Sequence, residues 1–302
     1  MEIIQQILIL YIVAGVGFVL ARLKVFNEQT VKTMSMLVAK VGIPALMIVK
    51  MQDAGDRSLL PAMAQTIVVS FALLIVLFYL SHLIFRHQKG LRRCIFVQMA
   101  TFSNCGFMGF PVIEAALGSL GLFHSIGFNA AFTILTWTLG LRLFSAKEKG
   151  SWKQMLNPGL IASVLGVLLY ALDIRLPVVI NSSLNYIQQI TTPLSMLVTG
   201  AYMSRITRSV ALDKQMWFSC SLRLIVYPLL TFALMLLVPI SVVQRNMFFI
   251  TMMMPCASVT VIQALAYGTD ESARMATGGV ALSTILSAAT IPLLLQLMPL
   301  MH

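Results

Sequence analysis

The chain has 302 residues, of which 59% are hydrophobic and only 10% are charged, and its formal net charge is +11. A soluble domain carries about 25% charged residues, so this chain has too few to cover a water-facing surface. These values exclude soluble, disordered and disulfide-scaffold proteins, and the long apolar runs exclude a transmembrane β-barrel, which leaves a polytopic helical membrane protein.

Ten apolar runs are long enough to be membrane spans, each of which needs about 20 residues. The predicted spans are 3–21, 31–50, 61–85, 94–117, 121–143, 158–173, 181–203, 216–238, 246–267 and 276–298. The chain begins Met-Glu without a basic segment, so we expect the first span to be retained and not cleaved as a signal.

The basic residues fall unevenly between the two sides of these spans. Fifteen Lys and Arg residues lie in loops on one side and four on the other, and Lys40 and Arg223 lie inside spans. Cytoplasmic loops carry the excess of Lys and Arg, so the first side is predicted to be cytoplasmic and both termini to face outward. The same explanation weakens nucleic-acid binding as the reason for the net charge, and we expect residence in the cytoplasmic membrane.

The predicted cytoplasmic linker 144–157 divides the chain into a first five-span unit, 1–143, and a second, 158–302. Short matches recur in the same order at offsets of 149 to 151 residues. They pair Gly17 with Gly166, Pro44 with Pro193, Cys105 with Cys256 and Thr133 with Thr284. Because five is odd, related units must have opposite orientation, and inverted repeats are typical of secondary transporters.

Two spans contain helix breakers at matching places. The fourth holds Gly106, Gly109 and Pro111 within six residues, and the ninth holds Pro255. Proline removes a backbone donor, and glycine lowers helix preference by about 1 kcal/mol. Unwound backbone at membrane depth is tolerated only where it faces protein or a water-filled cavity. An ordinary proline kink is the alternative, and we prefer it for Pro44, Pro193 and Pro228.

Paired breaks predict a substrate site. A proline favours the first turn of a helix, so Pro111 and Pro255 are expected near the starts of second half-helices. Two half-helix N-termini that meet at the midplane would bind an anion, assisted by neutral donors. The predicted substrate-binding residues are Ser103, Asn104, Gly106, Pro111, Pro255, Ser258, Thr260 and Gln263. For Gln263 a helix–helix hydrogen bond is the alternative.

Three ionisable residues inside spans are candidates for substrate charge or ion coupling, because such residues are costly in a membrane. Arg223 would attract an anionic substrate or pair with an acid, and the alternative is that it snorkels toward the cytoplasmic interface. Lys40 would pair with a carboxylate or line a cavity. Glu114 is a candidate proton or cation partner near the outer interface.

Neither metal nor catalytic chemistry is indicated by the motifs. The four cysteines lack CxxC spacing and are expected to be buried small hydrophobic residues. GxSxG, HExxH and P-loop motifs do not occur in the sequence, so we expect no enzyme, metal or cofactor.

Several segments resemble the auxin efflux carrier family over essentially the whole chain. They are Asn104-Cys-Gly-Phe-Met-Gly-Phe-Pro111, Asn157-Pro-Gly-Leu-Ile-Ala-Ser163, Thr191-Thr-Pro-Leu-Ser-Met-Leu-Val-Thr-Gly200, Arg223-Leu-Ile-Val-Tyr-Pro228 and the region of spans 9 and 10. The chain is most similar to the compact bacterial permeases of that family, whose fold is like that of sodium–bile acid symporters.

The resemblance implies ten transmembrane helices in two inverted five-helix repeats, with broken, crossing helices 4 and 9 marked by Asn104, Pro111 and Pro255. Spans 1, 2, 6 and 7 would form a scaffold and the others a moving transport domain. Its implied substrates are small organic anions such as malate and malonate. Coupling to H⁺ or Na⁺ stays open, because no clear sodium-ligand cluster is present.

The leading hypothesis is therefore a secondary transporter of small mono- or dicarboxylates that works by alternating access. Its expected partners are the organic anion and the lipid bilayer, with no nucleic acid; a homodimer stays open. The alternatives are a carrier of neutral or cationic solutes, and a membrane sensor or receptor without transport.

Overall fold

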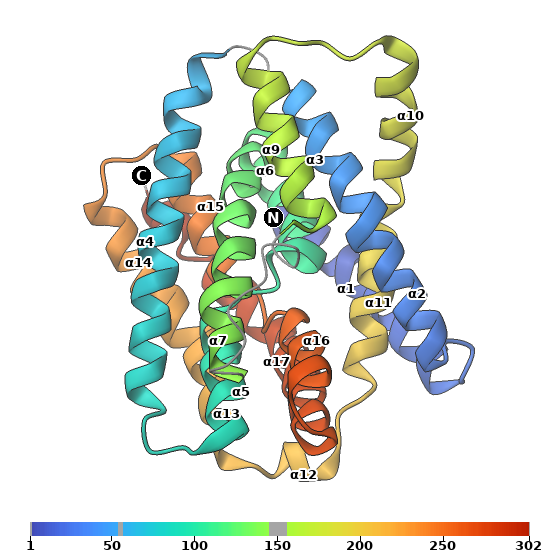
Figure 1. The fold of residues 1–302 in the computed structure, drawn as a ribbon, viewed down its shortest axis with the longest axis vertical. Helices are drawn as coiled ribbons and strands as arrows, with labels where there is room; N and C mark the ends of the chain where they lie inside the picture. Colours follow the sequence, from blue (N-terminus) through green and yellow to red (C-terminus); the bar gives the residue numbers. More distant parts are fainter. Residues whose placement is uncertain (1, 54–56, 145–155, 302) are drawn as a thin grey trace.

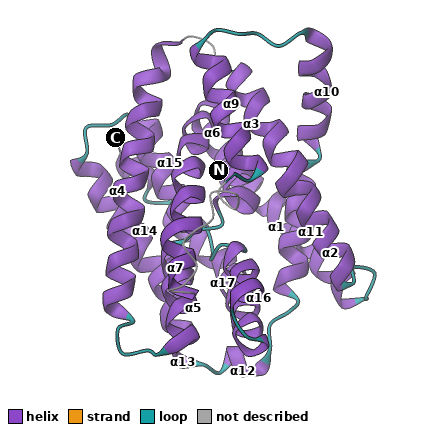
Figure 2. Cartoon of the chain, viewed as in Figure 1, coloured by secondary structure: helices purple, strands orange, loops and turns teal. Residues whose placement is uncertain are grey.

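The computed structural model describes residues 2–53, 57–144 and 156–301, and most of them lie in helices joined by short loops (Figures 1 and 2). Most of the predicted linker, 145–155, lies outside the described residues. Six helical stretches are candidate membrane spans by length and composition. They are Gln5–Arg22, Glu28–Gln52, Arg57–Ile84, Cys105–Phe144, Lys214–Leu237 and Asp270–Leu295. The all-helical class and the multi-pass membrane character are confirmed.

The helices of the first half follow one another with few loops. They are α1 (Glu2–Arg22), α2 (Glu28–Leu37), the π-helical turn η1 (Val38–Gly42), α3 (Ile43–Gln52), the short η2 (Arg57–Leu59), α4 (Leu60–Ile84), α5 (Gly90–Thr101), η3 (Cys105–Gly109), α6 (Phe110–Leu135), η4 (Thr136–Gly140) and α7 (Leu141–Phe144). The start of α2 is fixed by Asn27, whose side chain accepts a hydrogen bond from the Thr30 N–H.

A reversal inside α6 explains how the fourth and fifth expected spans are connected. Gly118 has a φ of 62° and a ψ of −157°, values that residues with a side chain rarely adopt. Its ideal Cβ position is open, so the backbone conformation and not crowding selects glycine there. The reversal falls in the predicted gap between 94–117 and 121–143.

The second half contains more interruptions. Its helices are α9 (Pro158–Ala171), α10 (Val178–Gln189), α11 (Thr191–Met203), α12 (Arg208–Ala211), α13 (Lys214–Ser221), the π-helical turn η5 (Leu222–Val226), α14 (Tyr227–Leu237), α15 (Val242–Met253), α16 (Val259–Tyr267), α17 (Asp270–Leu295) and η6 (Met298–Met301). Figure 1 places α12 at the lower end and the α9–α10 connection at the upper end.

Two groups of helices can be distinguished by their packing. The first group contains α1, α2, α3, α9, α10 and α11, with α1 on α11 and α9 on α3. Gly17 allows the α1–α11 approach, because a Cβ there would lie 2.1 Å from the Leu197 carbonyl oxygen. The second group contains α4 to α7 and α13 to α17, and its core is rich in fully buried phenylalanines.

Candidate functional site

Two helix interruptions meet in the interior of the protein. Helix α5 ends at Thr101 and helical structure resumes in η3, and α15 ends at Met253 before α16 begins. The extended segments between them pair in antiparallel fashion. Asn104 N–H donates to the Pro255 carbonyl at 2.8 Å, and Ala257 N–H donates to the Phe102 carbonyl at 2.9 Å. Four half-helix ends are thereby gathered at one place, which we call the crossing (residues 102–104 and 254–258).

The two helices that leave the crossing begin without side-chain caps. Asn104 and Ser258 occupy the N-cap positions of η3 and α16, yet neither side chain bonds to a backbone N–H of its helix. Both residue types normally make that bond. The hydroxyls of Ser103 and Thr260 are fully buried and lack a hydrogen-bond partner. The crossing therefore presents two helix N-termini, with their partial positive charge, beside neutral polar groups.

The two helices that enter the crossing are capped by one arginine. Arg223, in η5, is fully buried, and its Nε–H donates to the Met254 carbonyl at 3.1 Å. Its Nη1 donates to the carbonyls of Ala100 and Thr101, at 3.2 and 3.0 Å. Its Nη2 donates to the Met252 carbonyl at 2.6 Å and lies 3.6 Å from the sulfur of that residue.

These contacts occupy the five N–H donors of a guanidinium group. The carbonyls belong to the C-terminal ends of α5 and α15, where the helix dipole is negative, so Arg223 neutralises both ends. Arg223 does not snorkel toward an interface. All the N–H donors of Arg223 are directed at protein groups in this conformation. A contact between Arg223 and a substrate anion therefore stays a prediction.

The prolines lie differently from the expected helix starts. Helical structure resumes at Cys105, so Pro111 lies inside the helix, as the second residue of α6. The π-helical turn η3 immediately before it accommodates the missing donor, because its wider turn shifts the backbone bonding by one residue. Pro255 lies within the interruption and precedes α16 by four residues. Gly106 is half-buried in η3, close to Ile43.

Gln263 makes the alternative contact, a helix–helix hydrogen bond. Its side-chain amide donates to the Thr136 carbonyl at 3.0 Å, and its oxygen accepts from the Gln98 amide. Gln98 also donates to the Gly140 carbonyl at 2.9 Å. This network joins α5, η4 and α16 behind the crossing. Gln98 was not among the sequence candidates, and its position in an otherwise apolar stretch was the available signal.

The remaining ionisable candidates, Glu114 and Lys40, differ in their contacts. Glu114 in α6 forms an ion pair with Lys50 in α3, at 2.9 Å between Oε1 and Nζ. The Lys50 side chain is only 12% exposed, whereas that of Glu114 is 37% exposed. Lys40 lies exposed on η1 and forms no ion pair within 4.0 Å with a described acid. Roles for Glu114 and Lys40 in coupling stay predictions.

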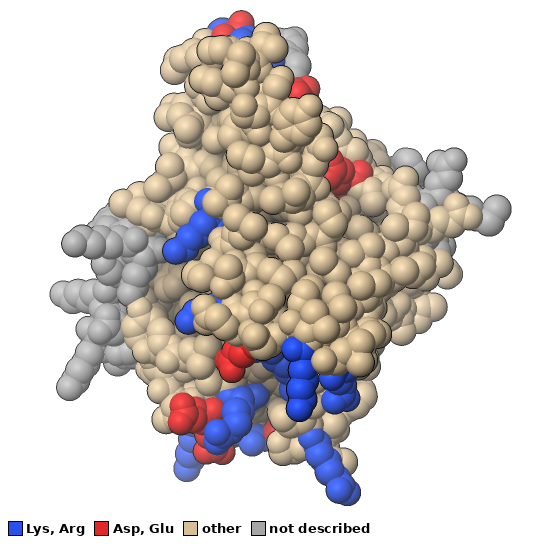
Figure 3. Space-filling view, turned by 90° about the vertical axis from the view of Figure 1, so that its right-hand side faces the viewer, with Lys and Arg blue, Asp and Glu red and all other residues tan. Residues whose placement is uncertain are grey.

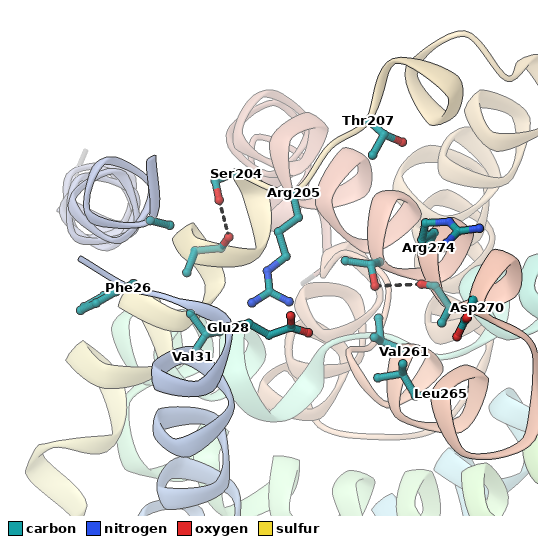
Figure 4. Close-up of a pocket in the computed structure, with 14 residues that line it drawn as sticks. Phe26, Glu28, Val31, Ser204, Arg205, Thr207, Val261, Leu265, Asp270 and Arg274 are labelled. Atoms are coloured by element: carbon teal, nitrogen blue, oxygen red, sulfur yellow. Dashed lines mark hydrogen bonds between the residues drawn. The ribbon is translucent and has the colours of Figure 1, made fainter. Parts of the chain in front are cut away.

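A cavity of about 490 Å³ opens between the two groups of helices (Figure 4). Its walls come from α1, α2, α11, α16 and α17. Val261 and Leu265 line it from α16, so the cavity borders the helix that starts at the crossing, but none of the eight predicted substrate-binding residues lines it. Its charged residues are Glu28, Arg205, Asp270 and Arg274.

Two of these four charged residues, Arg205 and Arg274, are among the fifteen basic residues that the sequence places in loops on the predicted cytoplasmic side. A charge near a helix end gives no sign of whether it faces a cavity, which depends on contacts between distant helices. Figure 3 shows Lys and Arg side chains gathered at the lower end of the molecule, the end at which α12 lies in Figure 1. The cavity residue Arg274 belongs to α17, on which α12 packs.

Comparison with known proteins agrees with this geometry. A helical membrane protein whose broken helices meet at an interior crossing, beside a cavity between two helix groups, has the organisation of a transporter. The family model described as "Membrane transport protein" matches residues 2–151 and again 147–295. The chain belongs to this family, and the resemblance to the auxin efflux carrier family is confirmed.

Two archaeal relatives are also described as transporters. An uncharacterized transporter of Methanocaldococcus jannaschii is 26% identical over 279 residues, which cover 87% of this chain and 89% of that protein. An uncharacterized transporter of Methanothermobacter thermautotrophicus is 25% identical over 303 residues, which cover 96% of each chain.

Proposed function

We propose that the protein is a secondary transporter that moves small mono- or dicarboxylates, such as malate or malonate, across the cytoplasmic membrane by alternating access. The observation that carries this proposal is the pair of uncapped helix starts at the crossing, with Asn104 and Ser258 at the N-cap positions. A carboxylate bound there would receive the backbone N–H groups that no side chain occupies.

The proposed architecture is ten spans in two inverted five-helix repeats. The family model matches each half separately. The helix packing supports the same relation, since expected span 1 packs on span 7 through Gly17 and expected span 6 packs on span 2 through Gly166. Gly17 and Gly166 are one of the sequence pairs related by the repeat, so the two contacts are reciprocal.

Alternating access would come from movement between the two helix groups. The first group would be the scaffold, and the second, which carries the crossing, would be the moving part. The cavity lies between them, as a route to the substrate would require. Coupling to H⁺ or Na⁺ and assembly as a homodimer remain predictions.

Transport of labelled malate and malonate into proteoliposomes tests the function. We expect uptake by the native protein and a loss of at least tenfold with Asn104→Ala, which removes the side chain and keeps the backbone bonds of the crossing. Asn185→Ala is the matched control, since Asn185 is exposed on α10. A well-folded protein that neither binds nor moves organic anions would refute the proposal.

Substrate competition separates the alternatives. Inhibition by neutral or cationic solutes, and not by carboxylates, would identify a carrier of another class. A sensor would bind a ligand without moving it and would need a soluble partner.

A further inference from the structure

The cavity has one acid and one base on each of its two facing walls. Glu28 at the start of α2 and Arg205 just after α11 belong to the first helix group. Asp270 and Arg274 in the first turns of α17 belong to the second. Figure 4 shows the Arg205 side chain pointing toward Glu28 of its own wall, with Asp270 on the opposite side and the Arg274 side chain directed away from both.

These charges are not paired in this conformation. The ion pairs found among the described residues are Lys50–Glu114, Arg57–Asp173, Arg92–Asp213 and Arg175–Asp173. None of them includes a charged residue of the cavity. The Arg205 guanidinium instead lies over the Tyr202 ring, 5.2 Å from its centroid. The two walls of the cavity thus carry opposite charges, and no ion pair within 4.0 Å joins them in this conformation.

At the opposite end of the same two helix groups, an acid and a base from the two groups are paired. Lys50 of α3 and Glu114 of α6 are joined at 2.9 Å. Glu28 and Lys50 lie near the two ends of one helical stretch of 25 residues. At 1.5 Å per residue these two positions are roughly 33 Å apart, which is the thickness of a membrane. One end is therefore closed with its ion pair formed, and the other is open with its charges apart.

We propose that Arg205 with Asp270, and Glu28 with Arg274, form an ionic gate that closes this cavity when the Lys50–Glu114 pair opens. The signs of the charges assign these partners, because each acid has a single base on the opposite wall of the cavity. The gate rests on the alternating access proposed above. It assigns a mechanical role to four residues and places the Lys50–Glu114 pair as their counterpart at the other end.

Thiol labelling of a cavity residue tests the gate without any substrate. Thr277 lines the cavity and is half-buried, and the four native cysteines are buried, so Thr277→Cys reports cavity opening in protein embedded in lipid nanodiscs. We expect Glu114→Gln to lower the labelling rate of Thr277→Cys about two- to fivefold, because loss of one partly exposed ion pair shifts the equilibrium by that order. In that background Arg205→Glu is expected to raise the rate again.

The charge-reversed double variant Arg205→Glu/Asp270→Arg should restore the low rate, since the pair can re-form with inverted sign. Arg208→Glu is the matched control, because Arg208 is exposed on α12 and does not line the cavity. The gate is refuted if Arg205→Glu behaves like Arg208→Glu, or if the reversal fails to restore the rate. The expected labelling pattern without organic-anion transport would keep the gate and overturn only the substrate proposal.

Discussion

At the scale of single residues, Arg223 is the side chain on which the crossing most depends. Its guanidinium satisfies four carbonyls from two helix ends that are far apart in sequence. We expect Arg223→Leu to lower the free energy of unfolding by about 3 kcal/mol or more, because buried carbonyls would be left unpaired at about 1–3 kcal/mol each. Arg223→Lys should recover part of this, since lysine keeps the charge without the planar fork.

Thermal unfolding in detergent measures this effect. Arg142→Leu serves as the control, because Arg142 is exposed on α7 and should change stability little. Equal stability of Arg223→Leu and the native protein would show that the helix ends are capped by other groups.

The role of Arg223 could be predicted only in part. Its position in an apolar run marked it as unusual, but the sequence offered an acid or a substrate as its partner. Its true partners are backbone carbonyls, which every residue has and which leave no pattern. The Gln98–Gln263 contact was also predicted only in part. A helix–helix hydrogen bond was an alternative for Gln263, but the sequence did not identify Gln98 as the partner.

At the scale of elements, the breaks in the fourth and ninth expected spans were predictable because glycine and proline act locally. Their meeting was expected from their matching places and from the family resemblance, but the antiparallel hydrogen bonding between them was not, because an extended segment of three residues has no sequence signature. The position of the helix restart was also missed, since η3 starts at Cys105 and not near Pro111. A π-helical turn forms through backbone bonding that the residue types do not specify.

The close packing of α1 on α11 gives a prediction at this scale. A Cβ on Gly17 would lie 2.1 Å from the Leu197 carbonyl oxygen, and backbone on both sides leaves little room to adjust. Gly17→Ala should therefore destabilise the protein by about 1–3 kcal/mol, as overpacking does. Gly15→Ala, two residues earlier in open space, should be neutral or stabilising by up to about 1 kcal/mol. Paired unfolding measurements that show no difference would contradict the close approach.

At the scale of the whole molecule, the sequence predicted the class of protein well, because the apolar fraction and the positions of breakers are summed over many residues. The cavity could not be predicted. It arises from the relation between two helix groups, and the charges that line it are indistinguishable in sequence from ordinary loop charges.

Orientation in the membrane is the last property of the whole molecule that can be tested. Fifteen Lys and Arg residues lie in loops at one side of the expected spans and four at the other, so moving the first side across a membrane would be the costlier insertion. We expect epitopes at both termini to be labelled in intact cells, and an epitope inserted between Gly150 and Ser151 to be labelled only after permeabilisation. The opposite pattern would place the cavity on the outer side, and the proposed gate would then close toward the exterior. Labelling of all three epitopes in intact cells would show mixed insertion and would contradict the single orientation that the charge asymmetry predicts.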